Sequence, residues 1–206
     1  MPSFRRQFTE PNLSLTVHKQ VPMPNIPYRM EFLDEDAARV AAEFKERRGG
    51  RVLNLDRMLL HCPPLAEGWA GLMVRVRKGY RISQRHRELA ICAVAAMSGA
   101  DYEFHHHVGP LIDAGGNQAQ VKALDDVAAA AVNATLFDAA ERAVLALALE
   151  STRDVKISAP TLAAVKAAFP DPAEVFELLM IIASYNMVSR VLVGLGIEIE
   201  GKEAKS

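Results

Sequence analysis

Apolar residues recur along most of the chain at intervals of three and four, which places them on one face of an α-helix. The first clear case runs from Ala37 through Val40 to Phe44, preceded by Asp34 as a helix N-cap and stopped by Gly49-Gly50. Alternation typical of a strand is confined to the neighbourhoods of residues 16 and 197–199. The pattern therefore predicts an all-α fold.

Capping residues, prolines and glycines divide the rest of the chain into further helices. We expect them at residues 55–61, 64–78, 83–98, 101–114, a short one from 117, then 138–151, 158–169 and 172–196. The last is apolar nearly all round, which predicts burial on most sides, with a second subunit supplying part of the cover. Its longest apolar run, residues 178–183, is far below the roughly 18–20 residues that span a bilayer. We therefore expect no membrane association.

Proline marks the organisation of the chain. Five of the eleven prolines fall within residues 1–33, which predicts an extended arm that covers its own domain or a neighbouring subunit. A partly disordered leader is an equally good interpretation of the same residues. Residues 34–200 form the expected single helical domain, and residues 201–206 a short tail.

Charge and cysteine content narrow the function classes. The 206 residues carry a formal net charge of −1, so no excess of basic residues indicates a nucleic-acid partner. The N-terminus has no apolar segment typical of a secretory signal. The two cysteines, Cys62 and Cys92, form no CxxC and are typical of free thiols in a reducing compartment. We therefore expect a cytoplasmic protein.

Two carboxylates and a histidine run carry the candidate chemistry. Glu103 and His107 are four residues apart, so on a helix they stand about 40° from each other and form a candidate acid–base pair. A turn at Ser98-Gly99 would fold the preceding helix back and bring Glu88 opposite Glu103. Two neighbouring carboxylates in an apolar bundle favour one of them keeping its proton. The alternative to an acid–base site is a solvent-exposed helix face whose histidines have no catalytic role.

The remaining candidates have a structural and a functional interpretation. His105 and His106 point away from His107, so the three cannot line one pocket. Cys92 follows Glu88 by one turn and is either a core residue or a lone reactive thiol. The sequence contains no HExxH motif, and we expect no metal. Other ambiguous positions are His86, expected to face solvent, and Trp69 and Tyr80, in a pocket or the core. Asn186 and Arg190 are expected either in a buried polar network or at the subunit interface.

Four segments resemble the carboxymuconolactone decarboxylase / alkylhydroperoxidase-D superfamily, over about residues 54–200. They are Arg57-Met-Leu-Leu-His-Cys-Pro-Pro-Leu, Arg87-Glu-Leu-Ala-Ile, Asp101-Tyr-Glu-Phe-His-His-His-Val and Tyr185-Asn-Met-Val-Ser-Arg. In the peroxidase branch a CxxC pair works with a glutamate and a histidine. Glu88 and His107 match the latter two, whereas Ala100 and Glu103 occupy the cysteine positions. Dithiol chemistry is therefore ruled out at that site.

What remains is similar to the decarboxylase branch, which implies a cofactor-free enzyme acting on a small carboxylated lactone or related acid. Glu88, Glu103 and His107 would be catalytic, with His107 held by Glu103 and either His107 or protonated Glu88 delivering a proton. We expect the substrate to contact Arg85 or Arg87 through its carboxylate, and also Tyr102, His106 and Cys92.

Two other functions remain open from the sequence. The first is peroxide turnover by Cys92 alone. The second is a non-catalytic helical binding protein, in which the glutamate and histidine groups would titrate normally. The resemblance also implies a homo-oligomer, from dimers to trimers and hexamers, with sites near subunit contacts.

Overall fold

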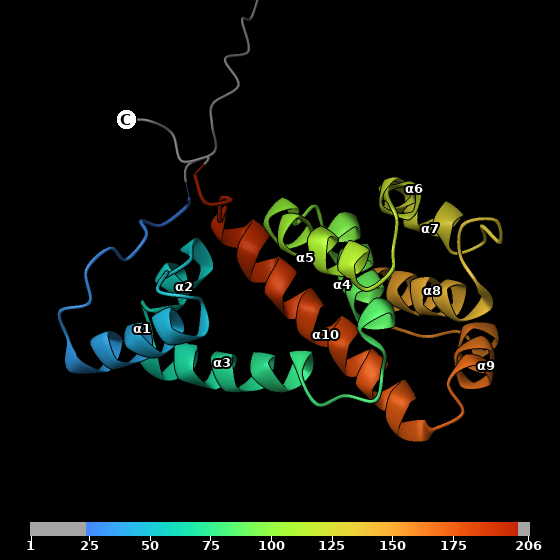
Figure 1. The fold of residues 1–206 in the computed structure, drawn as a ribbon, viewed down its shortest axis with the longest axis horizontal. Coiled ribbons are helices and arrows are strands. Elements are labelled where there is room, and N and C mark those ends of the chain that lie inside the picture. Colours follow the sequence, from blue (N-terminus) through green and yellow to red (C-terminus); the bar gives the residue numbers. More distant parts are fainter. Residues whose placement is uncertain (1–23, 202–206) are drawn as a thin grey trace, which may run out of the picture.

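The computed structural model describes residues 24–201, and within that range it contains helices and no β-strand. The predicted all-α fold is therefore confirmed (Figure 1). In chain order the elements are α1 (Glu35–Arg47), α2 (Asn54–Leu59), α3 (Pro63–Arg77), α4 (Gln84–Ser98), α5 (Asp101–Asp113), α6 (Gln118–Ala123), the 3₁₀ turn η1 (Leu124–Asp126), α7 (Val127–Ala130), α8 (Ala139–Arg153), α9 (Ala159–Ala168) and α10 (Pro172–Leu195).

Local capping chemistry sets most helix starts where the sequence predicted them. The side chains that accept a hydrogen bond from a first-turn backbone N–H include Asp34, Ser83, Asn117, Asp138 and Ser158. The sequence did not indicate η1 and α7, which residues 124–130 form. Residues 197–199, where the pattern alternates, form no strand, in agreement with the predicted all-α fold. The strand-like pattern near residue 16 lies outside the described residues.

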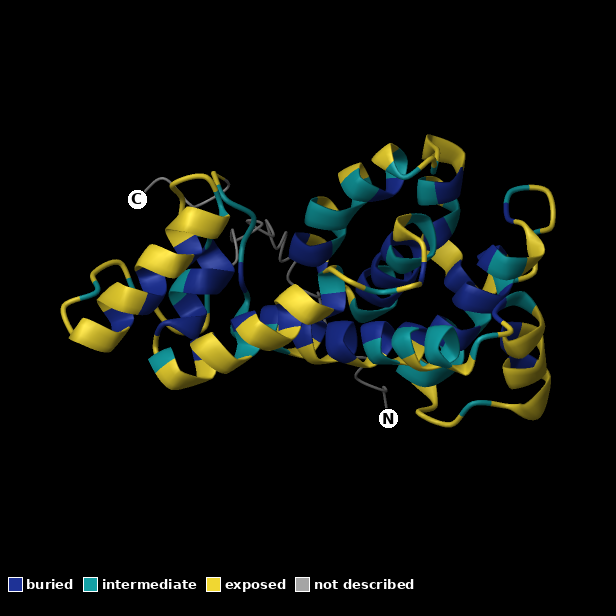
Figure 2. Cartoon of the chain, turned by 60° about the horizontal axis from the view of Figure 1, so that its bottom comes forward, coloured by how far each residue is buried: buried dark blue, intermediate teal, exposed yellow. Residues whose placement is uncertain are grey.

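Helix α4 is the centre of the bundle, and α5, α8 and α10 all pack against it. Every residue from Glu88 to Ala95 is buried, so this stretch contacts other helices on all sides. Small side chains at Ala90, Ala93 and Ala95 allow that close approach. Figure 2 shows the buried residues concentrated where the helices meet.

Helix α10 crosses the bundle diagonally in Figure 1 and contacts α3, α4, α5, α8 and α9. By length and composition alone it would also suit a membrane span, but half of its apolar window is buried among the other helices, as in a core helix. The helix is not covered on all sides, because Phe176, Leu179, Met187 and Val193 are exposed. The predicted subunit contact at this face stays a prediction.

The described part of the N-terminal arm, residues 24–33, is extended and lies on its own chain. Asn25 donates hydrogen bonds to the carbonyl oxygens of Gly194 and Leu195 at the end of α10. The hydroxyl of Tyr28 accepts a hydrogen bond from the backbone N–H of Glu198 at 2.9 Å. The two ends of the described chain therefore hold each other beside α2.

Candidate active site

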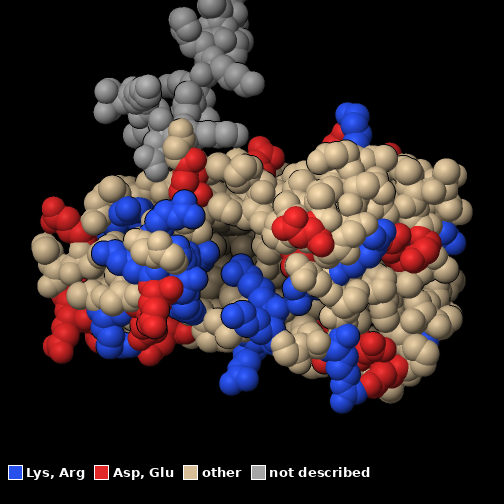
Figure 3. All heavy atoms as spheres, in the orientation of Figure 1, with Lys and Arg blue, Asp and Glu red and all other residues tan. Residues whose placement is uncertain are grey.

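A cleft of about 360 Å³ lies where α2 and α3 meet α4, α5 and α10. In Figure 3, Lys and Arg side chains border a hollow between the part of the molecule that holds α1–α3 and the rest. The residues that line the cleft are Arg48, Leu53, Leu55, Arg77, Gln84, Arg87, Glu88, Tyr102, Glu103, His106, His107, Pro110, Val188 and Leu192. It therefore collects most of the titratable side chains predicted from the sequence.

The turn between α4 and α5 brings Glu88 to His107. Gly99 adopts a left-handed conformation with φ of 63°, which lets α5 fold back along α4. The Nδ1 of His107 then lies 2.7 Å from the Oε2 of Glu88. The expectation that Glu103 holds His107 is wrong. Although the two share a helix face, Glu103 turns towards α10 and the imidazole turns towards α4.

The protonation states of this pair follow from its surroundings. Burial raises the pKa of Glu88, but hydrogen bonds and charge from His107 and Arg87 outweigh it and leave that pKa below its usual range. Burial lowers the pKa of His107, and the neighbouring Glu88 opposes this only in part. At neutral pH Glu88 is therefore an anion that accepts from Nδ1–H of a neutral His107. The Nε2 atom of that tautomer is an acceptor.

Two further residues extend this pair into a chain of hydrogen bonds. The hydroxyl of Tyr185 on α10 lies 3.3 Å from His107 Nε2, and Arg77 on α3 donates from Nε to the same hydroxyl at 2.9 Å. Since His107 Nε2 is an acceptor, Tyr185 donates to it. Glu88, His107, Tyr185 and Arg77 thus link α4, α5, α10 and α3 across the cleft.

Glu103 is the second carboxylate of the cleft and is almost fully buried. Its Oε2 accepts a hydrogen bond from the hydroxyl of Ser189 at 2.5 Å, while its Oε1 has no partner among the described residues. Burial raises the pKa of Glu103 to about 8, against the opposing effects of Ser189 and Arg77. Glu103 therefore carries a proton at neutral pH. One carboxylate was expected to do so, but burial rather than repulsion by Glu88 is the cause.

The arginines are distributed differently from the prediction. Arg85 is not among the cleft residues, because it is bonded to Glu141 at 2.6 Å and to the carbonyl oxygen of Gly115. This position does not favour the predicted contact between Arg85 and a substrate in the cleft. Arg87 lines the cleft and donates to Glu88 at 3.1 Å. Arg77 was not singled out from the sequence, because a basic residue in the last turn of a helix is usually explained by the helix dipole.

Tyr102 and His106 line the cleft as expected and are both held by Glu200. Tyr102 donates to Oε1 of Glu200 at 2.7 Å, and His106 Nε2 lies 3.2 Å from Oε2. Burial raises the pKa of Glu200, but hydrogen bonds from His106, Tyr102 and the Asn54 backbone lower it to about 2. No pattern in the sequence indicated Glu200. His105 is exposed and lies outside the cleft, as its helical position predicted.

Cys92 is fully buried and does not line the cleft, a position that does not favour its predicted substrate contact. Burial, followed by the charges of Glu88 and Glu103, raises the pKa of its thiol. Ala100 and Glu103 occupy the positions where the resemblance would place cysteines, and within residues 24–201 no cysteine reaches the cleft. The same described range contains no group of three or more His, Cys, Asp or Glu side chains arranged to hold a metal.

The other ambiguous residues have structural contacts. The ring of His86 is half-buried and packs edge-on against Phe169, with centroids 5.1 Å apart, so the expected solvent-facing position is wrong. Asn186 is buried and donates to Thr152, and Arg190 donates back to Asn186 from the exposed side of α10. This is the polar network that the sequence predicted.

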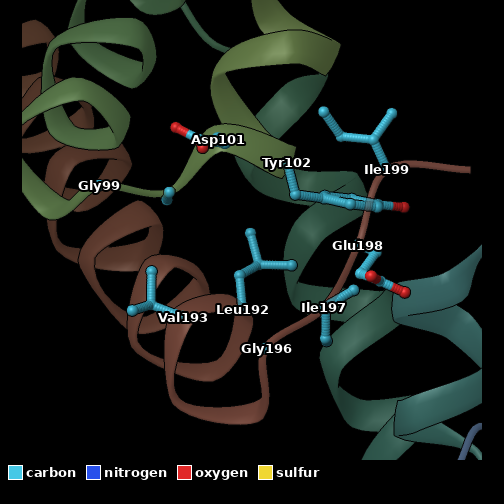
Figure 4. Close-up of a pocket in the computed structure, with 10 residues that line it drawn as sticks. Gly99, Asp101, Tyr102, Leu192, Val193, Gly196, Ile197, Glu198 and Ile199 are labelled. Atoms are coloured by element: carbon cyan, nitrogen blue, oxygen red, sulfur yellow. The ribbon is translucent and has the colours of Figure 1, made fainter. Parts of the chain in front are cut away.

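A neighbouring cavity of about 350 Å³ has different chemistry (Figure 4). It lies between the start of α5, the end of α10 and the segment after it, and it shares Tyr102 and Leu192 with the cleft. Leu192 and Ile197 give it mainly apolar walls. No acid and base converge there, so the cleft is the better candidate for an active site.

Comparisons with known proteins identify the fold. No protein-family model and no curated protein matches the chain. Solved structures do match. An uncharacterized peroxidase-related protein from Ralstonia eutropha JMP134, described as an alkylhydroperoxidase AhpD core, aligns with a TM-score of 0.71 and 17% identity over 88% of this chain and 94% of that one.

Two more solved structures agree. An uncharacterized peroxidase-related protein from Silicibacter sp. TM1040 aligns with a TM-score of 0.70 and 14% identity over 90% of this chain and 98% of the other. The debrominase Bmp8, in a complex with 2,3,4-tribromopyrrole, aligns with a TM-score of 0.67 and 19% identity over 87% and 95%. At these identities the likeness establishes an all-α AhpD-like fold. The resemblance predicted from the sequence motifs is thus confirmed at the level of the fold.

Proposed function

We propose that this chain is an acid–base enzyme that decarboxylates a small carboxylated lactone or a related acid. The observation that supports this most is a buried acid in the cleft. Burial raises the pKa of Glu103 to about 8, so its carboxyl group carries a proton at neutral pH and can act as a general acid. Burial lowers the pKa of His107, so that imidazole is neutral and does not compete as a proton donor.

Arg87 and Arg77 would contact different charged groups of such a substrate. Arg87 is partly neutralised by Glu88, so it would orient the substrate carboxylate without binding it too tightly. Tight binding of that carboxylate would stabilise the ground state and slow its loss. Arg77 has no acidic partner among the described residues, and it would stabilise the negative charge that develops on the lactone oxygen.

The reaction then needs one proton donor. The bond between the carboxylate carbon and the ring breaks, carbon dioxide leaves, and the electron pair moves into the lactone carbonyl to form an enolate. Glu103 gives its proton to the remote carbon of that enolate and becomes a carboxylate, which solvent reprotonates. His107 is neutral at this pH, so we assign it the role of orienting Tyr185 and, through it, Arg77.

The two other functions considered from the sequence gain less support. Peroxide turnover by Cys92 needs a thiolate, whereas that thiol is fully buried and its pKa is raised. A non-catalytic binding protein would leave Glu103 and His107 with ordinary pKa values, in contrast to the shifts in this cleft.

The test is release of carbon dioxide from γ-carboxymuconolactone by the metal-stripped protein. We expect Glu103→Gln, which keeps the size of the side chain, to lower the rate by about 10²-fold or more. Cys92→Ser is the control and should leave the rate within a factor of about two. Equal rates for Glu103→Gln and wild type would overturn the role of Glu103. No release by the wild type would overturn the decarboxylation of that lactone.

A further inference from the structure

A further cavity, of about 270 Å³ and distinct from the one in Figure 4, adjoins the cleft and has no role in the proposed reaction. It is enclosed by α1, α2 and α3, and it shares Arg48, Leu55 and Arg77 with the cleft. The two cavities are therefore neighbours with these three residues between them.

The walls of this further cavity suit a flat apolar ring. They include Phe44 from α1, Leu59 from α2, and Trp69 and Met73 from α3. Trp69 is only partly buried, so part of its indole surface is open to a ligand. Aromatic and thioether side chains favour aromatic rings over flexible alkyl chains because they stack or pack against the ring face.

The charges around the cavity favour an anion. Arg47, Arg48, Arg77 and Lys78 line it, against the single carboxylate of Asp56. Asp56 is paired with Arg48 at 2.7 Å, which leaves three positive charges without a matching carboxylate in the lining. Helices α1 and α3 both end here, and each C-terminus contributes about half a negative charge. Three full charges outweigh these two partial ones.

Helix-end stabilisation explains part of this arrangement but not all of it. Arg47 donates to the carbonyl oxygen of Glu43 and packs over the Phe44 ring, as expected of a basic residue in a last turn. The guanidinium of Arg77 instead turns inwards to Tyr185. Among residues 24–201, Lys78 makes no ion pair. The Lys78 ammonium and the two terminal nitrogens of Arg77, which make no hydrogen bond among residues 24–201, are thus available to a ligand, while Arg77 Nε stays with Tyr185.

We propose that this cavity is a binding site for a small aromatic carboxylate, with the ring against Trp69 and the carboxylate between Arg77 and Lys78. The proposal concerns a second site and stands whether or not the cleft decarboxylates a lactone. Because Arg77 belongs to both cavities, a ligand bound here would also change the electrostatics of the cleft.

Trp69 is the only tryptophan in the chain, so its fluorescence reports on this cavity alone. We would titrate the full-length protein with benzoate and follow Trp69 emission, with calorimetry as a second readout. We expect a saturable change with benzoate and a much weaker one with benzyl alcohol, which has the ring without the charge. Lys78→Gln should weaken benzoate binding by about tenfold, the usual effect of removing a charge-assisted hydrogen bond.

Two variants locate the bound benzoate. Arg75→Gln removes an exposed charge on α3 that lines neither cavity and should leave the affinity unchanged. Arg87→Gln changes only the cleft and should also leave it unchanged. Three results would overturn the proposal: no saturable fluorescence change and no heat of binding, equal weakening by Arg75→Gln and Lys78→Gln, or weakening by Arg87→Gln but not by Lys78→Gln.

Discussion

His107 Nδ1 lies 2.7 Å from Glu88 Oε2, although Glu103 is the carboxylate that shares a helix with His107. This contact separates the two glutamates into different roles. Glu88 is an anion that orients an imidazole, and Glu103 is left as a buried acid bound to Ser189. The acid–base chemistry of the cleft therefore depends on contacts between helices and not on spacing within one helix.

The Glu88–His107 contact predicts how His107 titrates. The Glu88 carboxylate opposes the effect of burial and keeps the pKa of His107 from falling further. Glu88→Gln should therefore lower the pKa of His107, measured by NMR of the imidazole nitrogens across a pH series. A lowered pKa in Glu103→Gln together with an unchanged one in Glu88→Gln would mean that Glu103 is the partner after all.

Burial of Glu103 predicts how stability varies with pH. In the unfolded chain Glu103 loses its proton near pH 4.5, and in the folded chain it does so near pH 8. Between these values the folded state binds more protons, so the free energy of unfolding falls as pH rises. At about 1.4 kcal/mol per pKa unit, the total effect is on the order of a few kcal/mol.

Glu103→Gln cannot ionise and should remove most of this slope, so its stability relative to wild type should be greater at pH 8.5 than at pH 5.5. Urea unfolding at both pH values measures the difference. Glu46→Gln, at an exposed position on α1, is the matched control and should keep the slope of the wild type. A steep fall in stability that persists in Glu103→Gln would assign the effect to another group.

Replacement by glutamine should affect mainly the reaction rate at Arg77 and mainly the stability of the fold at Arg85. Arg77→Gln removes the cation that would stabilise the enolate, so the rate of carbon dioxide release should fall by about 10²-fold or more. Arg85→Gln leaves Glu141, whose side chain is 4% exposed, without its cation. Removing one partner of a fully buried ion pair costs about 3–5 kcal/mol, and here we expect roughly 2 because Arg85 is 33% exposed.

Urea unfolding and the rate of carbon dioxide release per folded molecule separate these two effects. Arg85→Gln should retain the wild-type rate at low temperature, and Arg77→Gln should retain most of the wild-type stability. The assignment of the two arginines fails if Arg85→Gln abolishes the reaction in fully folded protein.

The exposed face of α10 predicts self-association. Phe176 is 66% exposed and Met187 36%, and both lie on one side of the helix together with Leu179. We expect light scattering coupled to size exclusion to give a homo-oligomer, and we expect the double variant Phe176→Glu, Met187→Glu to reduce its mass. Val132→Glu, at an exposed apolar position in the turn after α7, should keep the oligomer. A monomeric wild type would contradict the prediction.

Local signals were sufficient to predict most of the helices. Residues such as Ser83 and Asp138 satisfy first-turn N–H groups with their own side chains, so the helix start is determined within a few residues. Residues 124–130 were missed because two short elements, η1 and α7, follow directly on α6 there without a full apolar period. Tertiary packing, which decides such short turns, is not visible in the local pattern.

The sequence predicted most of the residues that form the site, but it did not predict which of them form hydrogen bonds with one another. The spacing of Glu103 and His107 shows that they share a helix face, but it cannot show which neighbouring helix each side chain turns towards. Ser189 and Tyr185 lie in a segment that the family resemblance singled out, without any role being indicated. Arg77 and Glu200 gave no local signal at all, since their importance comes from partners about a hundred residues away.

The hydrogen-bonded series Arg77–Tyr185–His107–Glu88 draws one group from each of four helices, with Arg77 and Tyr185 separated by 108 positions. Its order of assembly during folding should differ from that of the helices. Individual helices form in about a microsecond, whereas contacts between distant parts of the chain come late because loop closure must precede them. On refolding, the circular-dichroism signal of the helices should thus return before catalytic turnover does, which makes turnover the stricter indicator of a native molecule.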